Sequence, residues 1–293
     1  MFAKLIIIPL LLFTSLSHAA DTLENIKHSR HITIAYRNAP PFSYQQKNGE
    51  VVGYVIDLCH LIVRNIEKST GNEHIDINYI DNPLLIERSK LLSSHKADMI
   101  CSVNSGNANW DPVAYYSVPY AISHTKFVSA QEITEIGKLQ GRTVSVTSGS
   151  YDSLVLNKIN REKGLNLMVV TAPTMASAFK MMSDGISSAV FINDISLQDI
   201  VDTAKDKRRY TISVDNIEAV QHFVILLQKD NELRKIVNRT LCSVLHSAEF
   251  DDLYNKWFNS PLPDTMINLH HPLTSEVKLA LLSSAECKWQ ASP

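Results

Sequence analysis

Short polar side chains follow an apolar run in the first half of the chain. Residues 99–103 (MICSV) are apolar enough for a buried strand, and six small or polar residues come directly after them. Loops at the carboxyl ends of strands in an open α/β sheet collect ligands, because free backbone N–H groups and side chains converge there. Asn104, Ser105 and Asn109 are therefore candidate ligand donors, although the same residue types also form ordinary turns.

The elements that must position this loop alternate between strand and helix patterns. The first series has strand patterns at 32–36, 75–80 and 99–103, with helical spacing at 53–68 and 83–95. A second series has strand patterns at 143–147, 167–171, 189–192 and 210–214, with helices at 151–163, 175–183 and 195–204. This alternation predicts an α/β fold with parallel sheets flanked by helices.

Two similar α/β units with the C-terminal third left over predict a chain that crosses from one lobe to another and returns. We expect lobe 1 to comprise residues 21–122 and 221–293, and lobe 2 to comprise residues 123–220. Two crossover segments make a hinge, and a hinged cleft is how a protein closes on a small solute.

The N-terminus indicates export. Lys4 precedes an apolar run at 5–16, and Ser17-His18-Ala19 places small residues where a signal peptidase reads them. The run is too short for a spanning helix, so we expect residues 1–19 to be a signal peptide, with cleavage after Ala19 or Ala20. The net charge of −2 and the absence of a basic run argue against nucleic acid and anionic membrane surfaces as partners.

Four cysteines would then lie in an oxidising compartment, where three full pairings are possible. We expect Cys242 to pair with Cys287, because a bridge there would hold the C-terminal tail. Cys59 and Cys101 lie in apolar patterns, where a thiol more often behaves as a small buried hydrophobe. Neither the cysteines nor His270-His271 have the spacing of a metal site, and we expect the His pair to lie in a solvated tail with no metal or cofactor bound.

Taken together, several motifs resemble the family 3 extracellular solute-binding proteins, the periplasmic receptors of polar amino acid ABC importers. The resemblance is strongest to the glutamate/aspartate-binding branch and covers nearly all of the mature chain. It rests on residues 37–44, 52–58, 96–98, 116–120, 139–160 and 254–263. It implies a two-lobed type II binding protein, monomeric, with an inner-membrane ABC permease as partner.

The resemblance also implies a ligand site. Basic residues at the end of the first strand and in the second helix hold the ligand's side-chain carboxylate in that branch, and Arg37 and Arg88 occupy these positions. A guanidinium fork suits a carboxylate. Ser105 stands for the family's hydroxyl residue, whereas Trp110 falls where an Arg normally grips the α-carboxylate, and Trp has only one N–H donor.

Lobe 2 would supply the remaining contacts. Ser148 and Ser150 match the family's carboxylate-holding loop at a strand-to-helix turn. The family uses an Asp after a lobe 2 strand to receive the ligand's amino group; a gapless register places Asn193 there, and a shift of one residue places Asp194 there. Aromatic rings, Trp110 among them, could compensate by cation–π contact with a ligand cation, with Phe42 and Tyr44 as the other two.

The resulting hypothesis is a receptor, not an enzyme, for a small polar ligand, with an acidic amino acid as the first choice. A changed specificity for a non-amino-acid solute is one alternative, given Trp110. A second is a periplasmic dehydratase acting on cyclohexadienyl substrates, for which Glu87, Asp111 or Asp194 could donate a proton. A third is a degenerate member acting as a sensor, whose cleft no longer closes on solute.

Overall fold

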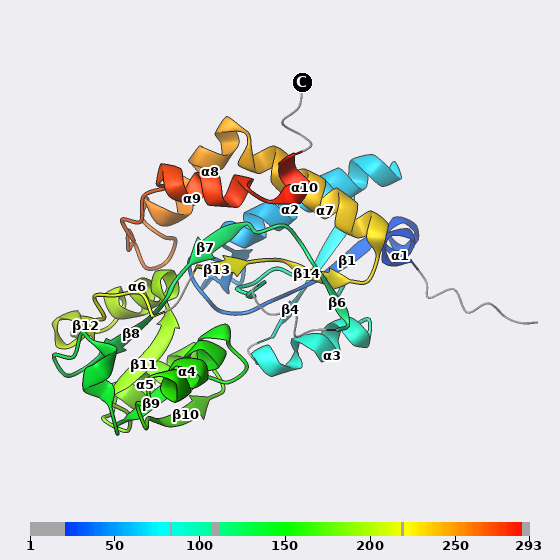
Figure 1. The fold of residues 1–293 in the computed structure, drawn as a ribbon. Helices are drawn as coiled ribbons and strands as arrows, with labels where there is room; N and C mark the ends of the chain where they lie inside the picture. Colours follow the sequence, from blue (N-terminus) through cyan, green and yellow to red (C-terminus); the bar gives the residue numbers. More distant parts are fainter. Residues whose placement is uncertain (1–20, 83, 107–111, 218–219, 289–293) are drawn as a thin grey trace, which may run out of the picture.

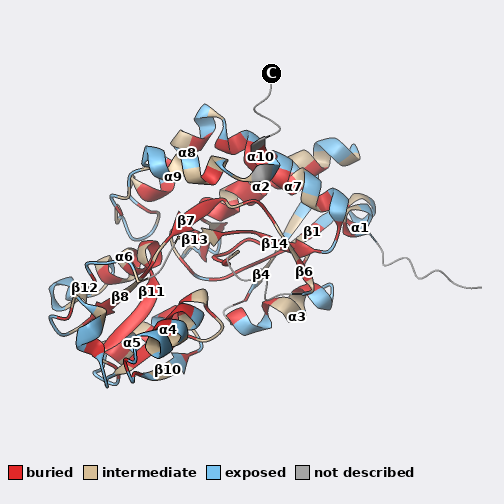
Figure 2. Ribbon diagram, in the orientation of Figure 1, coloured by how far each residue is buried: buried red, intermediate tan, exposed pale blue. Residues whose placement is uncertain are grey.

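The computed structural model describes residues 21–82, 84–106, 112–217 and 220–288, and it contains two lobes, each built on its own five-stranded sheet (Figure 1). The signal peptide expected at residues 1–19 lies outside these ranges. Within them, no helix combines the length and the apolar character needed to cross a membrane. Buried residues follow the strands and the inner faces of the helices, as Figure 2 shows.

Lobe 1 is built on a sheet in which the strand order is β4-β1-β5-β14-β6. Strand β1 pairs in parallel with β4 and β5, as predicted, and β14 is antiparallel to β5 and β6. Helices α2 and α7 cover one face and α3 the other (Figure 1). The bounds are β1 His31–Tyr36, β4 Asp76–Asp81, β5 Met99–Ile100, β6 Ala114–Tyr116, β14 Leu226–Gln228, α1 Thr22–Ser29, α2 Tyr54–Thr70, α3 Arg88–Ser93, α7 Asn231–Leu245, α8 Ala248–Phe258, α9 Ser275–Leu282 and α10 Ala285–Lys288, with a β2–β3 hairpin at Tyr44–Gln45 and Val51–Val52.

Lobe 2 is built on a second sheet, ordered β10-β9-β11-β8-β12. Strand β9 is parallel to β10 and β11, whereas β8 is antiparallel to β11 and β12. The central strand β11 is buried on both faces, which explains its continuous apolar sequence. The bounds are β8 Thr125–Ser129, β9 Thr143–Thr147, β10 Met168–Ala172, β11 Ala189–Asn193, β12 Thr211–Ile212, α4 Tyr151–Glu162, α5 Met175–Ser183 and α6 Asp194–Asp202, with short 3₁₀ turns at Ile136–Leu139 and Lys207–Arg209.

Two strands carry the chain between the lobes. Strand β7 (Ala121–Ser123) leads directly into β8, and β13 (Gln221–Phe223) brings the chain back to lobe 1. The two strands pair antiparallel, with Gln221 opposite Ser123. This paired ribbon is the two-crossover hinge that the sequence predicted.

The two faces of α6 belong to different cores. Leu197 and Val201 pack into lobe 2 with Val190 of β11. Ile195, by contrast, belongs to the large apolar cluster of lobe 1. Side chains three and four residues apart share a helix face, so the face that carries Ile195 and Asp199 is turned away from the lobe 2 core.

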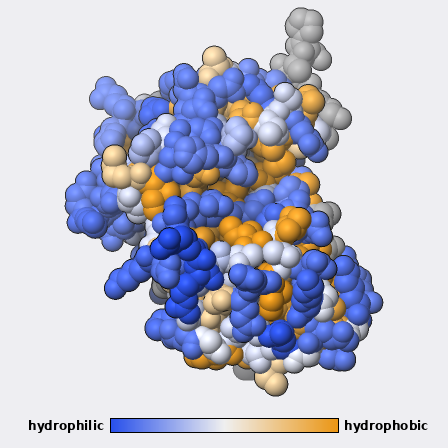
Figure 3. All heavy atoms as spheres, turned by 90° about the vertical axis from the view of Figure 1, so that its left-hand side faces the viewer, coloured by the Kyte–Doolittle hydropathy of each residue, from blue (hydrophilic) through white to orange (hydrophobic). Residues whose placement is uncertain are grey.

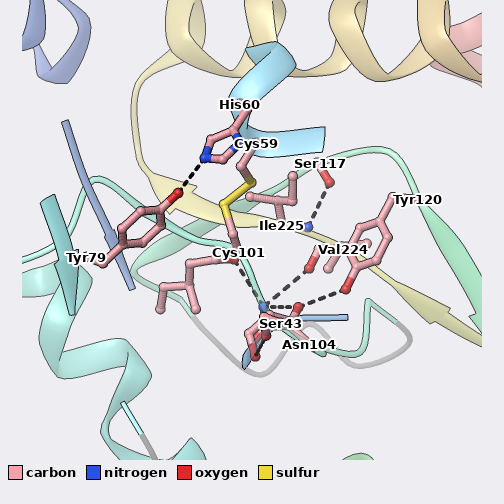
Figure 4. The surroundings of a disulfide bond; sticks show 12 residues. Ser43, Cys59, His60, Tyr79, Cys101, Asn104, Ser117, Tyr120, Val224 and Ile225 are labelled. Carbon is pink, nitrogen blue, oxygen red and sulfur yellow. Dashed lines mark hydrogen bonds between the residues drawn. A yellow bond between two sulfur atoms is a disulfide. The ribbon is translucent and has the colours of Figure 1, made fainter. Parts of the chain in front are cut away.

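Both pairs of cysteines form disulfides. The predicted bridge from Cys242 of α7 to Cys287 of α10 is confirmed, with a Cα–Cα distance of 5.2 Å. The expectation that Cys59 and Cys101 stay as thiols is wrong: they form a bridge between α2 and the end of β5, with a Cα–Cα distance of 6.6 Å (Figure 4). Both residues are fully buried, because a disulfide is as compatible with an apolar core as a thiol is.

The C-terminal region packs against lobe 1, whereas a solvated tail was expected there. Helices α9 and α10 pack on α7, and α1, which the sequence patterns did not reveal, packs on α7 and β1. His270 is exposed, as expected, but His271 is half-buried with its ring 6.3 Å from that of Phe258. Burial lowers the pKa of His271, so the paired histidines do not form a uniformly solvated tail.

Candidate functional site

A cavity lies between the two lobes, beside the hinge. In Figure 3 the molecule narrows at this level. The lining residues come from the ends of β1, β9, β11 and β13, from the first turns of α3, α4 and α5, and from loops of lobe 1: Arg37, Leu85, Arg88, Val103, Ser105, Thr147, Ser150, Tyr151, Asp152, Met175, Ile192, Asn193 and Gln221.

Arg37 and Arg88 give the lobe 1 side of the cavity its positive charge. Arg37 directly follows β1, is 9% exposed, and its Nε makes no hydrogen bond with the described residues. Burial, with a further contribution from the Arg88 charge, lowers the pKa of Arg37 to about 10. Two buried guanidinium groups repel each other. An anion between them would offset this repulsion and would accept a hydrogen bond from Arg37 Nε.

Asp152 of lobe 2 lies opposite this positive charge. It is in the first turn of α4, is 7% exposed, and accepts a hydrogen bond from Thr125 Oγ1 at 2.7 Å. Burial raises the pKa of Asp152 to about 6, although Thr125, Gln221 and Arg37 favour the ionised form. Asp152 is not among the site residues predicted from the sequence.

A signal for Asp152 does exist in the sequence. It stands three and four residues before Val155 and Leu156, and hence on the buried face of α4. A carboxylate on an apolar helix face is rarely placed there without a partner or a function. The helical spacing was therefore the observation that could have identified it.

The loop between β9 and α4 lines the cavity through Ser150 but not through Ser148. Ser150 caps α4: its Oγ accepts from Ser153 N at 3.1 Å and donates to Thr147 O at 2.8 Å. The Ser148 N–H donates to Ala172 O at 2.8 Å. A side chain at Gly149 would place its Cβ 3.4 Å from Ile86 N, so this loop lies against lobe 1.

Of the three polar residues predicted after β5, the structure describes Asn104 and Ser105, and of these only Ser105 lines the cavity. Its backbone forms a β-bridge with Phe223 of the hinge ribbon. The Asn104 amide nitrogen lies among backbone carbonyls and donates to Ser102 O at 2.9 Å and to Ile100 O and Val224 O at 3.3 Å (Figure 4). Asn104 therefore joins the end of β5 to the segment between β13 and β14. Asn109, Trp110 and Asp111 lie outside the described residues.

The structure does not bring Phe42 and Tyr44 to the cavity, contrary to the expectation that they contact a ligand cation. Phe42 is fully buried, and its ring lies 5.3 Å from that of Phe223. The Tyr44 ring packs edge-on against Trp257 at 6.2 Å, and its hydroxyl donates to Pro263 O at 3.5 Å. Both rings gain more from burial in the lobe 1 core than from a place at its edge.

The two neighbouring residues at the end of β11, Asn193 and Asp194, have different roles. Asn193 lines the cavity, but its Oδ1 caps α6 by accepting from Ser196 N at 2.9 Å. Asp194 is turned to the hinge, where Ser123 Oγ donates to it, Ile195 N donates at 2.9 Å, and His124 Nδ1 lies 3.4 Å away. Burial would raise the pKa of Asp194, but hydrogen bonds from His124 and Ser123 outweigh it and lower that pKa.

The structure describes two of the three proton donors considered for a dehydratase, and neither is placed for that chemistry. Glu87 is exposed and Asp194 serves the hinge, and neither lines the cavity. In the described part of the chain, no group of three His, Cys, Asp or Glu side chains is arranged to hold a metal ion.

The chain is similar to glutamate/aspartate-binding proteins of two bacteria. The chain is 26% identical over 265 residues to the glutamate/aspartate import solute-binding protein of Escherichia coli K12, covering 89% of this chain and 87% of that protein. The L-glutamate/L-aspartate-binding protein of Pseudomonas aeruginosa is 24% identical, with 90% and 89% covered.

Solved structures share the fold at lower identity. The substrate-binding protein of an amino acid ABC transporter superposes with a TM-score of 0.67 at 21% identity, covering 78% of this chain and 100% of that one. An ancestral amino acid-binding protein, described as a precursor of cyclohexadienyl dehydratase, gives 0.68 at 19% identity, covering 81% and 99%. The sequence profile of one protein family, the bacterial extracellular solute-binding proteins, family 3, matches residues 32–260. The chain therefore belongs to the bacterial extracellular solute-binding proteins, family 3.

Proposed function

We propose that this protein is a periplasmic receptor that binds an acidic amino acid in the cavity between its lobes and delivers it to an ABC importer. The observation that carries the proposal is the pair of buried guanidinium groups, Arg37 and Arg88, on a cavity lined by both lobes. Two such groups favour a ligand with at least one carboxylate. Lobe 1 would comprise residues 21–122 and 221–293, and lobe 2 residues 123–220.

The relatives support the same ligand class, transport role and cell compartment. Two glutamate/aspartate-binding proteins match about nine-tenths of this chain. Histidine-binding relatives are described as periplasmic, and one structural neighbour belongs to an amino acid ABC transporter. The ligand would contact Arg37, Arg88, Ser105, Ser150 and Asn193, which are the predicted residues that line the cavity.

A dehydratase-like enzyme is the second candidate. One structural neighbour is described as a precursor of such an enzyme, and Asp152 is a buried carboxyl group at the cavity whose pKa of about 6 suits proton transfer near neutral pH. The positive charge beside it favours a receptor for anions, because Arg37 and Arg88 cannot themselves donate or accept protons near neutral pH.

Calorimetric titration tests the receptor proposal. The chain without its signal peptide is unfolded and refolded to remove bound ligand, then titrated with glutamate, aspartate, glutamine and dicarboxylates. We expect micromolar or tighter binding of glutamate or aspartate, and a loss of at least about tenfold in Arg37→Gln and in Arg88→Gln. Arg64→Gln, an exposed residue on α2, is the matched control and should bind as the wild type does.

Two results would reject the proposal. One is a folded protein that binds no amino acid. The other is tight binding that is unchanged in both cavity variants, because it would place the ligand elsewhere. Turnover of a cyclohexadienyl acid with release of water or carbon dioxide would instead favour the enzyme.

A further inference from the structure

The charges around the cavity are divided between the lobes. Arg37 and Arg88 of lobe 1 are the positive side chains in the described lining, and Asp152 of lobe 2 is the negative one. A ligand with an anionic group and a cationic group would contact both lobes at once. Its anion would face the guanidinium groups and its cation would face the carboxylate.

The end of β11 offers no carboxylate for the cation. Asn193 is neutral, and its oxygen already caps α6. The Asp194 carboxylate is held by donors from Ser123, His124 and Ile195. Turning Asp194 into the cavity would leave these buried donors without an acceptor, and each lost bond to a charged group costs about 1.5–3 kcal/mol.

The Asp152 carboxylate has a hydrogen-bond acceptor site left for a ligand, whereas Asn193 and Asp194 do not. A carboxylate can accept about four hydrogen bonds. Thr125 donates one at 2.7 Å, and Gln221 and the Asp152 backbone also act on the carboxylate, which leaves an acceptor site for a ligand. Gln221, only 2% exposed, also lines the cavity and favours the ionised form of Asp152. The buried Asp152 carboxylate thus lies at the cavity beside the hinge, where lobe closure would bring a ligand against it.

We propose, on the basis of the receptor function above, that Asp152 holds the ligand's ammonium group and that the cavity therefore selects amino acids over simple dicarboxylates. Asp152 replaces in this role the residue expected at the end of β11. The ammonium would donate to the carboxylate oxygen that Thr125 leaves available.

A plainer role for Asp152 is to neutralise Arg37, whose charge it faces. The two roles predict opposite effects of Asp152→Asn, which keeps the shape of the side chain and an acceptor for Thr125. If Asp152 holds the ammonium, the variant loses glutamate affinity at least tenfold and keeps or gains affinity for glutarate, which has no amino group. If Asp152 only neutralises Arg37, both ligands bind more tightly to the variant.

The experiment is therefore calorimetric titration of wild type and Asp152→Asn with L-glutamate and with glutarate at pH 8. We expect the wild type to prefer glutamate and the variant to lose that preference, while Asp206→Asn, at an exposed position outside the cavity, keeps it. A preference that is unchanged in Asp152→Asn would overturn the inference and leave the receptor proposal intact. A wild type that binds no amino acid would overturn both.

Proton release by the wild type gives a second test that does not need the variant to fold. The groups that act on the Asp152 carboxyl are Thr125, Gln221, Arg37 and the Asp152 backbone, none of which titrates near pH 6. Because the pKa of Asp152 is about 6, binding of an ammonium should release about half a proton at pH 6 and almost none at pH 8. Titrations of glutamate in buffers with different ionisation enthalpies, at several pH values between 5 and 7, measure this number, and no release at any of them would overturn the inference.

Discussion

We predict that Asp199 on α6 makes the stability of this protein depend on pH. The residue is 5% exposed, and its Oδ1 makes no hydrogen bond with the described residues. Burial, with a contribution from the charge of Asp202, raises the pKa of Asp199 to about 7. Its charge also raises the pKa of Tyr44 in lobe 1, which places it on the side of α6 that faces that lobe.

The sign and size of the effect follow from this pKa. An unfolded Asp titrates near 3.9, so the folded protein holds the proton more tightly than the unfolded chain does. The stabilisation is complete below about pH 4 and is lost as the pH rises through 7. About three tenfold steps in proton affinity, at about 1.4 kcal/mol each, give a cost of about 4 kcal/mol at pH 8.

Asp199→Asn removes the charge and keeps the shape of the side chain. We expect the free energy of unfolding at pH 8 to rise by about 2–4 kcal/mol relative to the wild type, and the difference to shrink towards pH 5. Urea denaturation at several pH values measures both quantities. Asp206→Asn, at an exposed position, is the matched control and should change stability by less than about 0.5 kcal/mol.

Two results would refute this reasoning. If Asp199→Asn is no more stable than the wild type at pH 8, the buried carboxylate is compensated by a contact that the described residues do not provide. If the difference is the same at pH 5 and pH 8, it does not come from the titration of Asp199.

The disulfides and Gly53 give two further predictions. Each bridge closes a loop of 42 or 45 residues, so Cys59→Ser/Cys101→Ser and Cys242→Ser/Cys287→Ser should each lower the free energy of unfolding by about 4 kcal/mol; a loss below 1 kcal/mol in either would contradict the chain-entropy argument. Gly53 has φ +139°, and a Cβ there would lie 2.2 Å from Phe42 O. Gly53→Ala should therefore cost about 3 kcal/mol or more by thermal denaturation, whereas Gly137→Ala, with open space around it, should be nearly neutral.

The sequence predicted the order of strands and helices well, because burial imposes a period that can be read locally. Residues 53–68 show the period of a helix, and the structure has α2 at Tyr54–Thr70. Strand β11 reads as a continuous apolar run because helices cover both of its faces. The hinge could be predicted from chain order, because the C-terminal third remained after two α/β units and had to return to the first lobe.

Partners distant in the sequence were harder to predict. Cys59 and Cys101 are 42 residues apart, and each apolar pattern shows that a thiol is buried but not what it faces. Phe42 and Tyr44 follow a strand end, where ligands collect, yet their rings face the lobe 1 core. A local pattern gives the burial of a side chain, whereas its direction depends on elements packed from elsewhere in the chain.

The charged site shows this difference most clearly. The family resemblance assigned Arg37 to the site as the basic residue at the end of the first strand. Its place in the cavity lining agrees with the rule that the carboxyl end of a parallel strand opens onto the cleft. The choice between Asn193 and Asp194 could not be made from the register, because it depends on which side chain caps α6 and which one the hinge donors hold. The folded lobes meet both demands together. The carboxylate that lines the cavity is then that of Asp152, 41 residues before Asn193, on a helix whose apolar spacing indicates that it is buried.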